Sequence, residues 1–244
     1  TPHIPSTPHT TDTANTADVS GAASTDYFGY AVSIGDDTDG DGYDELIVGA
    51  YGNDDGTYKG GTAYAFHGPL TGSLAATDAD ATFYGESTYD FMGQYVTKTA
   101  GDIDGDGTGD YILGAAGFDQ PASAAGALFI FLGPISGEHG ASDADTIITG
   151  AGSSEFVGYN AHTGDDFNGD GVADILLGAS GESEAYIFYG PLTAGTRDTS
   201  TADVTFVGAR SGDATGSNVT AAGFDGDGPI AAALGIENND TGPA

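Results

Sequence analysis

The chain has 244 residues, 39% of them hydrophobic, with no cysteine and a formal net charge of −33. This charge excludes nucleic acid as a partner, because binding to phosphates needs a basic surface, and the missing cysteines exclude disulfides, thiolate metal sites and a cysteine nucleophile. The apolar content is enough for a folded core, and no apolar run reaches the roughly 20 residues of a membrane helix, so we expect no membrane insertion.

The first 15 residues are rich in Thr and Pro and show no hydrophobic period. Such a composition predicts a linker or tail rather than a packed element. The chain starts at Thr1 and shows no signal peptide, so we expect a processed chain from which the targeting segment has been removed. Residues 16–235 are predicted to form the folded domain, and residues 236–244 a short C-terminal tail.

The stretch GDDTDGDGYDELIVGA (35–50) recurs as GDIDGDGTGDYILGAA (101–116) and GDDFNGDGVADILLGAS (164–180), and a fourth copy, AGFDGDGPIAAALG (222–235), is eroded. An acid-aromatic-x-Gly element precedes each intact copy, ending at Gly29, Gly93 and Gly158. An aromatic run that ends in Gly-Pro follows each copy. Landmarks at fixed offsets indicate a repeated structural unit.

Within each unit, short runs rich in Val, Ile, Tyr and Phe alternate with Gly, Asp, Ser and Pro, which is typical of strands. In the first unit we expect one strand after Gly29 and further strands at ELIVGA, AYAFHG and ATFYGE. Four strands in roughly 60 residues match one blade of a β-propeller. The predicted fold is therefore all-β, with blades of four antiparallel strands, three full repeats and an incomplete fourth. With one strand before Gly21, the expected total is fifteen.

The combination of Phe-Gly, a DxDxDG loop and Gly-Ala resembles the FG-GAP repeat of integrin α-subunit propellers and of many bacterial surface proteins. The resemblance covers residues 16–235. The proline that follows Gly-Ala in the family is replaced here by Tyr51, Ala116 and Ser180. The resemblance implies an extracellular or cell-surface module for adhesion or structural assembly, without catalysis. Related repeat proteins also suggest two alternatives, a carbohydrate-binding propeller and an accessory domain of a larger secreted enzyme.

Three loops carry oxygen-bearing side chains at positions 1, 3, 5 and 9, a glycine at position 6 for the turn, and a backbone carbonyl available at position 7. The predicted ligands are Asp37, Asp39, Asp41, Tyr43 (carbonyl) and Glu45 in loop 1 (37–45); Asp102, Asp104, Asp106, Thr108 (carbonyl) and Asp110 in loop 2 (102–110); and Asp166, Asn168, Asp170, Val172 (carbonyl) and Asp174 in loop 3 (166–174). Converging oxygen ligands favour Ca²⁺, with about three structural ions in all.

The EF-hand motif and the ions Mg²⁺ and Zn²⁺ fit the acidic loops less well. An EF-hand needs a glutamate at position 12 and flanking helices, whereas position 12 here is Val48, Leu113 or Leu177, within a predicted strand. Magnesium demands stricter octahedral geometry, and zinc prefers His or Cys, which the loops lack. A solvated acidic turn without an ion is the remaining alternative. The fourth copy retains only Asp225 and Asp227 as acids and is predicted to bind nothing.

The sequence shows no catalytic motif, and the five histidines do not recur at one repeat position, so they are interpreted as ordinary surface or strand residues. The aromatics of the Gly-Pro runs alternate with a period of two and are expected to pack between blades rather than to form a sugar platform. The alternating aromatics include Tyr64, Phe66, Phe129, Phe131, Tyr186 and Phe188.

The chain stops inside a blade, and three outcomes are open: a longer propeller, a small four-bladed ring, or neighbouring copies that complete one another. We therefore expect either a protein partner or further copies of the chain at the open blade edges. A glycan ligand is the alternative.

Overall fold

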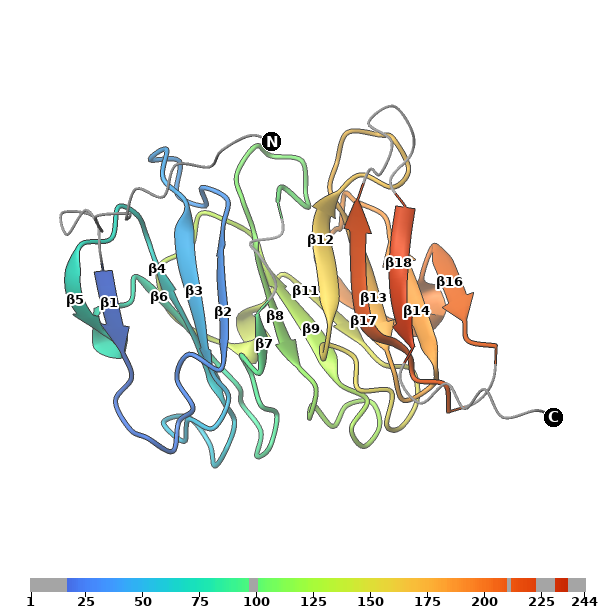
Figure 1. Ribbon diagram of the computed structural model, residues 1–244, viewed down its shortest axis with the longest axis horizontal. Coiled ribbons are helices and arrows are strands. Elements are labelled where there is room, and N and C mark those ends of the chain that lie inside the picture. Colours follow the sequence, from blue (N-terminus) through green and yellow to red (C-terminus); the bar gives the residue numbers. More distant parts are fainter. Residues whose placement is uncertain (1–16, 97–100, 210–211, 223–230, 237–244) are drawn as a thin grey trace, which may run out of the picture.

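The structure is a computed structural model and describes residues 17–96, 101–209, 212–222 and 231–236 (Figure 1). It is all-β, apart from three short 3-10 helices. The strands are β1 (Ala17–Ser20), β2 (Ala31–Gly35), β3 (Glu45–Ala50), β4 (Thr62–Phe66), β5 (Gly72–Ala75), β6 (Ala81–Tyr84), β7 (Tyr95–Val96), β8 (Tyr111–Ala115), β9 (Ala127–Phe131), β10 (Gly137–Gly140), β11 (Thr146–Thr149), β12 (Ala161–Asp165), β13 (Asp174–Ala179), β14 (Glu184–Phe188), β15 (Gly195–Asp198), β16 (Val204–Val207), β17 (Thr215–Ala222) and β18 (Ala231–Ile236), and the 3-10 helices are η1 (Ala76–Asp78), η2 (Ala141–Asp143) and η3 (Thr199–Thr201).

The strands form antiparallel sheets that follow the predicted repeat. Blade 1 has the order β2-β3-β4-β6, blade 2 has β7-β8-β9-β11, blade 3 has β12-β13-β14-β16, and β17 and β18 form the described part of a fourth. Figure 1 shows these sheets side by side in chain order. The prediction of all-β blades with four antiparallel strands is confirmed, and Val48, Leu113 and Leu177 lie in β3, β8 and β13.

Each of the first two blades also has a fifth strand, which the sequence did not predict. Strand β10 of the second repeat pairs in parallel with β6, the last strand of blade 1. Strand β15 of the third repeat pairs in the same way with β11 of blade 2, and β5 pairs with β1. Within the described residues, the second and third repeats therefore each add one strand to the outer edge of the preceding blade, and the first repeat pairs its β5 with β1.

The core lies between the blades. Blades 1 and 2 share one buried cluster, in which the ring of Phe83 lies 4.6 Å from that of Phe131 and 5.3 Å from that of Tyr111. A second cluster joins blades 2 and 3, and a third joins blade 3 to β17 and β18. The six alternating aromatics named in the Gly-Pro runs are all buried, as expected. Complete burial of one such side chain stabilises the fold by about 1.5–3 kcal/mol.

The Phe-Gly and Gly-Ala motifs meet where two blades touch. A Cβ atom on Gly49 of β3 would lie 1.9 Å from the carbonyl oxygen of Gly93, which belongs to the next repeat. A Cβ atom on Gly114 would likewise lie 2.0 Å from the carbonyl oxygen of Gly158, and one on Gly178 would lie 2.0 Å from that oxygen of Gly216. No side chain fits into this space, so the two glycine motifs permit the close packing of successive blades.

Two further expectations concern the ends of the chain and membrane insertion. The predicted tails, residues 1–15 and 236–244, lie outside the described residues except for Ile236, so these domain bounds stay predictions. None of the helices in the described segments is long and apolar enough to cross a membrane.

Candidate metal centre

The three acidic loops lie at the same end of the blades, each joining the first two strands of its sheet (Figure 1). They are also connected to one another. The N–H of Gly109 in loop 2 donates to the carbonyl oxygen of Asp37 in loop 1 at 3.2 Å. In the same way, the N–H of Ala173 in loop 3 donates to the carbonyl oxygen of Asp102 in loop 2 at 3.3 Å. The fold therefore arranges the loops in a row, with each loop in contact with the next.

Local backbone hydrogen bonds shape each loop around its first carboxylate. In loop 1, Asp37 Oδ1 accepts from the N–H of Gly40 at 2.6 Å, and Oδ2 accepts from the N–H of Gly42 at 2.8 Å. Asp102 and Asp166 accept from the equivalent donors in loops 2 and 3. In all three loops, the side chains at positions 3 and 5 also accept from the N–H groups at positions 5 and 7.

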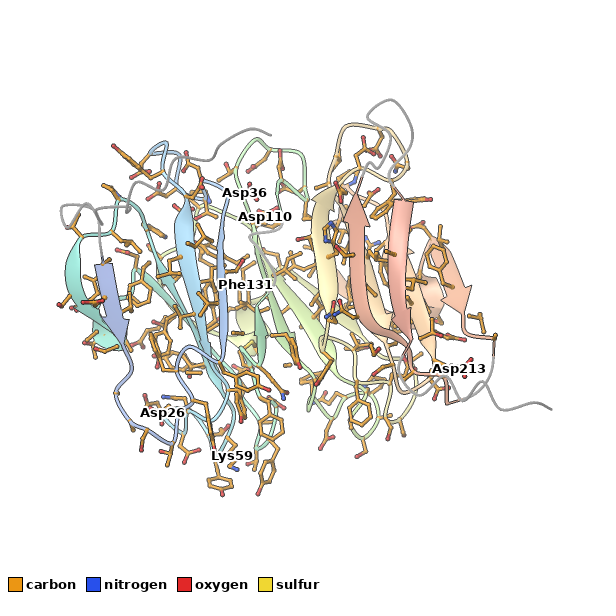
Figure 2. All side chains as sticks on the ribbon, viewed as in Figure 1. Asp26, Asp36, Lys59, Asp110, Phe131 and Asp213 are labelled. Carbon is orange, nitrogen blue, oxygen red and sulfur yellow. The ribbon has the colours of Figure 1, made fainter. Side chains whose placement is uncertain are left out.

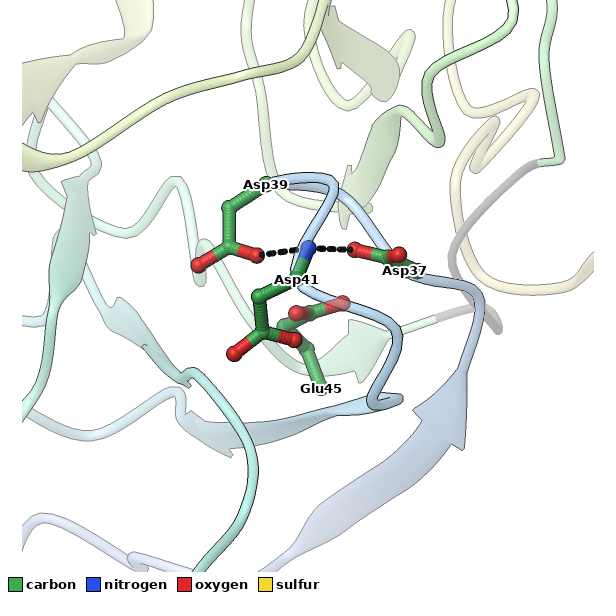
Figure 3. Close-up of side chains that lie close together, drawn as sticks. All are labelled: Asp37, Asp39, Asp41 and Glu45. Atoms are coloured by element: carbon green, nitrogen blue, oxygen red, sulfur yellow. Dashed lines mark hydrogen bonds between the residues drawn. The ribbon is translucent and has the colours of Figure 1, made fainter.

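Loop 1 brings its four predicted acids together (Figure 3). Asp37, Asp39, Asp41 and Glu45 each offer one oxygen, and these oxygens lie within 4.8 Å of one another. Glu45 is fully buried. Its Oε2 accepts from the N–H of Thr38 at 2.8 Å, but its Oε1 is buried without a hydrogen-bond partner. A buried oxygen in that condition costs free energy unless something binds it.

Loop 2 gathers three of its four predicted acids, namely Asp102, Asp104 and Asp106. The fourth, Asp110, is buried and is not part of that group. Its Oδ2 accepts from the N–H of Ile103 at 2.8 Å and its Oδ1 from the N–H of Gly133 at 2.9 Å. Position 9 of this loop therefore already has a structural role.

Loop 3 repeats the arrangement of loop 2 at position 9. Asp174 accepts from the N–H groups of Phe167 and Gly190, at 2.6 and 2.8 Å. At position 3, Asn168 donates from Nδ2 to Asp170 Oδ2 at 2.9 Å. The loop has one carboxylate fewer than loop 1, because position 3 is an amide. The backbone carbonyls of Tyr43, Thr108 and Val172 stay predicted ligands, as do the side chains at the other positions of the three loops.

The electrostatics of the loops divide the carboxylates into two classes. The backbone N–H of Gly171 and its neighbours lower the pKa of Asp166, against the effect of burial, and so favour its charged form. Burial, with a smaller contribution from the neighbouring loop carboxylates, raises the pKa of Asp110 to about 6. Burial also raises the pKa of Glu45. Position 9 is therefore where negative charge is most costly, and a divalent cation would offset that cost.

The structure also shows contacts that residue type and spacing did not predict. His67, interpreted from the sequence as an ordinary residue at a strand end, places Nδ1 3.1 Å from Asp39 Oδ2 in loop 1. Asp80, Asp145 and Asp203, each directly before the outer strand of a blade, accept from the N–H that precedes each Gly-Pro glycine. Their sequence signal was the repeated Ala-Asp pair at a fixed offset. These three acids stabilise the blade and lie outside the acidic loops.

The residues of loop 1 fit a bound cation. The group offers only oxygen atoms as metal ligands, and one of them, Glu45 Oε1, is buried and has no hydrogen-bond partner. Hard oxygen donors of this kind suit Ca²⁺. The acids of the fourth copy, Asp225 and Asp227, lie outside the described residues.

Comparison with known proteins gives the same repeat. The family model described as FG-GAP repeat matches residues 28–66 and 157–196. Among curated proteins, integrin alpha-PS2 of Drosophila melanogaster is 29% identical over 194 residues, which cover 75% of this chain and 14% of that protein. Integrin alpha-PS5 of the same species is 33% identical over 171 residues, covering 67% of this chain and 16% of that protein.

A third relative, integrin alpha-5 of Xenopus laevis, is 32% identical over 180 residues, covering 70% of this chain and 16% of that protein. The chain thus spans about one sixth of the length of these relatives. The glycine contacts between blades, the three acidic loops and these matches lead to one conclusion: the chain belongs to the integrin-alpha-like FG-GAP repeat proteins.

Proposed function

We propose that the protein is a calcium-binding, non-catalytic β-propeller module that serves adhesion or structural assembly outside the cell. The observation that carries the calcium site is Glu45 Oε1, a buried oxygen without a hydrogen-bond partner inside a group of four carboxylates. Loops 2 and 3 repeat the same backbone network, which supports an ion in each of them.

The charge of the loops supports a structural role for the ion. Carboxylates a few Å apart repel one another by about 1 kcal/mol per pair even in a water-like medium. A divalent cation reverses the sign of this interaction. Because each loop contacts the next through its backbone, ordering one loop also supports its neighbour. Calcium would thus fix one end of the blade stack.

Calorimetric titration with Ca²⁺ tests this proposal, and we expect about three sites. Asp104→Ala and Asp170→Ala should each remove one site, since each deletes a carboxylate from one loop. Asp227→Ala in the eroded fourth copy is the matched control and should remove none, because Pro229 at its position 7 has no N–H for the loop network. A wild-type protein that takes up no Ca²⁺ at millimolar concentration contradicts the proposal.

An adhesive role is supported by the similarity to integrin alpha subunits and by an exposed surface at the opposite end of the blades. This tyrosine surface consists of Tyr27, Tyr30, Tyr58 and Tyr89, each about half exposed. Figure 2 shows Asp26 and Lys59, the sequence neighbours of Tyr27 and Tyr58, at the end away from Asp36 and Asp110. Exposed tyrosines in a group are typical of binding surfaces for other molecules.

The rings of the tyrosine surface are linked through two further aromatics. Tyr27 stacks on Tyr51 at 4.9 Å, and Phe91 lies 6.0 Å from Tyr51 and 5.8 Å from Tyr89. A protein partner is the proposed occupant, and the same rings favour a glycan as the second candidate, since sugars stack on aromatic faces. Glycan-array binding that is lost in Tyr58→Ala but kept in Tyr43→Ala, an equally exposed tyrosine in loop 1, would decide for the glycan.

A further inference from the structure

A chain of four polar side chains crosses from loop 1 into blade 2. His67 Nδ1 lies 3.1 Å from Asp39 Oδ2, and His67 Nε2 lies 3.1 Å from the hydroxyl of Tyr111. The Tyr111 hydroxyl lies 2.6 Å from Thr38 Oγ1. Thr38 belongs to loop 1, whereas Tyr111 is the first residue of β8, and both are fully buried. We call these four residues the loop-1 relay.

With a neutral imidazole at His67, the hydrogen bonds of the relay take one consistent set of directions. The Asp39 carboxylate can only accept, so His67 Nδ1 carries the hydrogen. In the neutral imidazole, Nε2 is then an acceptor, and the Tyr111 hydroxyl must donate to it. The remaining bond therefore runs from the Thr38 hydroxyl to the Tyr111 oxygen. All four groups are satisfied at once, which is what a buried polar chain requires.

The relay fixes both oxygens of Asp39. Oδ1 accepts from the N–H of Asp41 at 3.0 Å, and Oδ2 accepts from His67. A carboxylate held by two donors from different directions keeps one orientation, so its remaining lone pairs stay directed. His67 side-chain exposure is only 15%, which leaves the imidazole little freedom to move.

The other two loops, both of which lie within the described residues, have no counterpart of this chain. Position 2 is Ile103 in loop 2 and Phe167 in loop 3, and the residue at the place of His67 is Leu132 or Tyr189. The place of Tyr111 in the following repeat is taken by Ile175, which packs with Ile103 in an apolar cluster. The side-chain contact between position 2 of a loop and the next blade is therefore polar at loop 1 and apolar at loop 2.

We propose that His67 is a positioning residue for the metal site of loop 1: it holds Asp39 in place from a different strand and makes loop 1 the strongest of the three sites. This inference rests on the proposed calcium binding. It adds that the three loops are unequal and names the residues that cause the inequality. Residues that orient a metal ligand typically contribute about 10- to 100-fold to metal affinity.

Terbium(III), a luminescent substitute for Ca²⁺, tests the inference in the full chain. Tyrosine excites a nearby terbium ion, and loop 1 alone carries a tyrosine at position 7, Tyr43. His67→Leu, which installs the residue found in repeat 2, should weaken the tyrosine-sensitised site by about tenfold or more. Tyr111→Phe should weaken it less, because it removes the partner of His67 Nε2 and of Thr38 but leaves the contact between His67 and Asp39 in place. Tyr189→Leu, at the same place in repeat 3, is the matched control and should leave the affinity of the loop-1 site unchanged.

His67→Asn separates positioning from general folding, because its amide can still donate from about the place of Nδ1, and it should restore most of the affinity. An unaltered loop-1 affinity in His67→Leu, or an equal loss at all three sites, overturns the inference while leaving the proposed function intact. A wild-type protein that binds neither terbium nor Ca²⁺ overturns both. The melting temperature of each metal-free variant confirms that the protein compared is folded.

Discussion

Loop 1 and loop 3 share a backbone network but differ in what surrounds it. In both loops the first carboxylate accepts from the N–H groups at positions 4 and 6. At position 9, Asp174 has a backbone donor for each of its oxygens, whereas Glu45 has a donor for only one. At position 2, loop 1 has the hydroxyl of Thr38, and loop 3 has an aromatic ring, Phe167.

The difference shows which part of a site is local and which is not. Residues two to five positions apart along the chain set the shape of the loop, so a loop sequence of nine residues is enough to repeat it. The anchoring of the ligands depends on the next strand and the next blade, because Gly190 reaches Asp174 and Tyr111 reaches Thr38. Loops with one consensus sequence can therefore differ in affinity.

Removal of the metal should have the largest effect and should expose the difference between the loops. At a Ca²⁺ concentration 100 times the dissociation constant, each ion stabilises the fold by about 2.7 kcal/mol, so three ions contribute about 8 kcal/mol. Chelation should lower the melting temperature accordingly. Hydrogen exchange should then accelerate most at loop 1, where Glu45 loses its only partner for Oε1, and least at loop 3. A chelator that leaves both measurements unchanged contradicts this expectation.

The glycine contacts test whether the blades themselves are equivalent. Gly49→Ala and Gly114→Ala each place a Cβ about 2 Å from a carbonyl oxygen of the next repeat, and overpacking of this kind costs about 3 kcal/mol or more. The two costs should agree in urea unfolding, although only the contact between blades 1 and 2 carries the loop-1 relay. Gly56→Ala, whose nearest neighbour would lie at 3.3 Å, is the control and should cost much less. Unequal costs would show that the contacts between blades, and not only the loops, differ from one repeat to the next.

Substitutions at position 9 of the loops should have a smaller effect on stability, and one that differs between loop 1 and loop 3. In metal-free protein, Asp174→Asn leaves one of two backbone N–H groups without an acceptor, which costs about 1–3 kcal/mol. Glu45→Gln removes a buried charge that had only one donor, so the metal-free stability should stay within about 1 kcal/mol of wild type. With Ca²⁺ present, Glu45→Gln should lose the loop-1 ion. Urea unfolding with and without chelator measures the free energy of unfolding of both variants. Equal losses of stability in chelator would contradict the difference between loops 1 and 3 at position 9.

Much of this arrangement is predictable from the sequence because it is local. The offsets of Asp37, Asp102 and Asp166 fix the loops, and the alternating aromatics fix the buried strands. The parallel-pairing strands β5, β10 and β15 were missed, since stretches such as GEHG carry no apolar alternation and pair only through their backbones. The partnership of His67 with Asp39 was missed for another reason. It depends on how two strands end at the same loop, which residue type and spacing do not encode.

The pH dependence of the metal-free protein should give the smallest of these effects. Burial raises the pKa of Asp110 to about 6 in the folded state, from 3.8 for the unperturbed group. The folded state then binds a proton more tightly than the unfolded state, so this group stabilises the fold below about pH 4 and loses that contribution as the pH rises through 6. Buried Glu45 and Asp174 act in the same direction.

The melting temperature in chelator should therefore fall between pH 4.5 and pH 7 at constant ionic strength, and the fall should be smaller in Asp110→Asn. General repulsion among the surface carboxylates changes over the same pH range, and the difference between wild type and Asp110→Asn cancels it. Saturating Ca²⁺ should reverse the trend, because the ion binds the ionised loops and is displaced by protons. Identical pH profiles for wild type and Asp110→Asn would mean that Gly133 and Ile103 already compensate the buried charge of Asp110, leaving no electrostatic reason for loop 2 to need an ion.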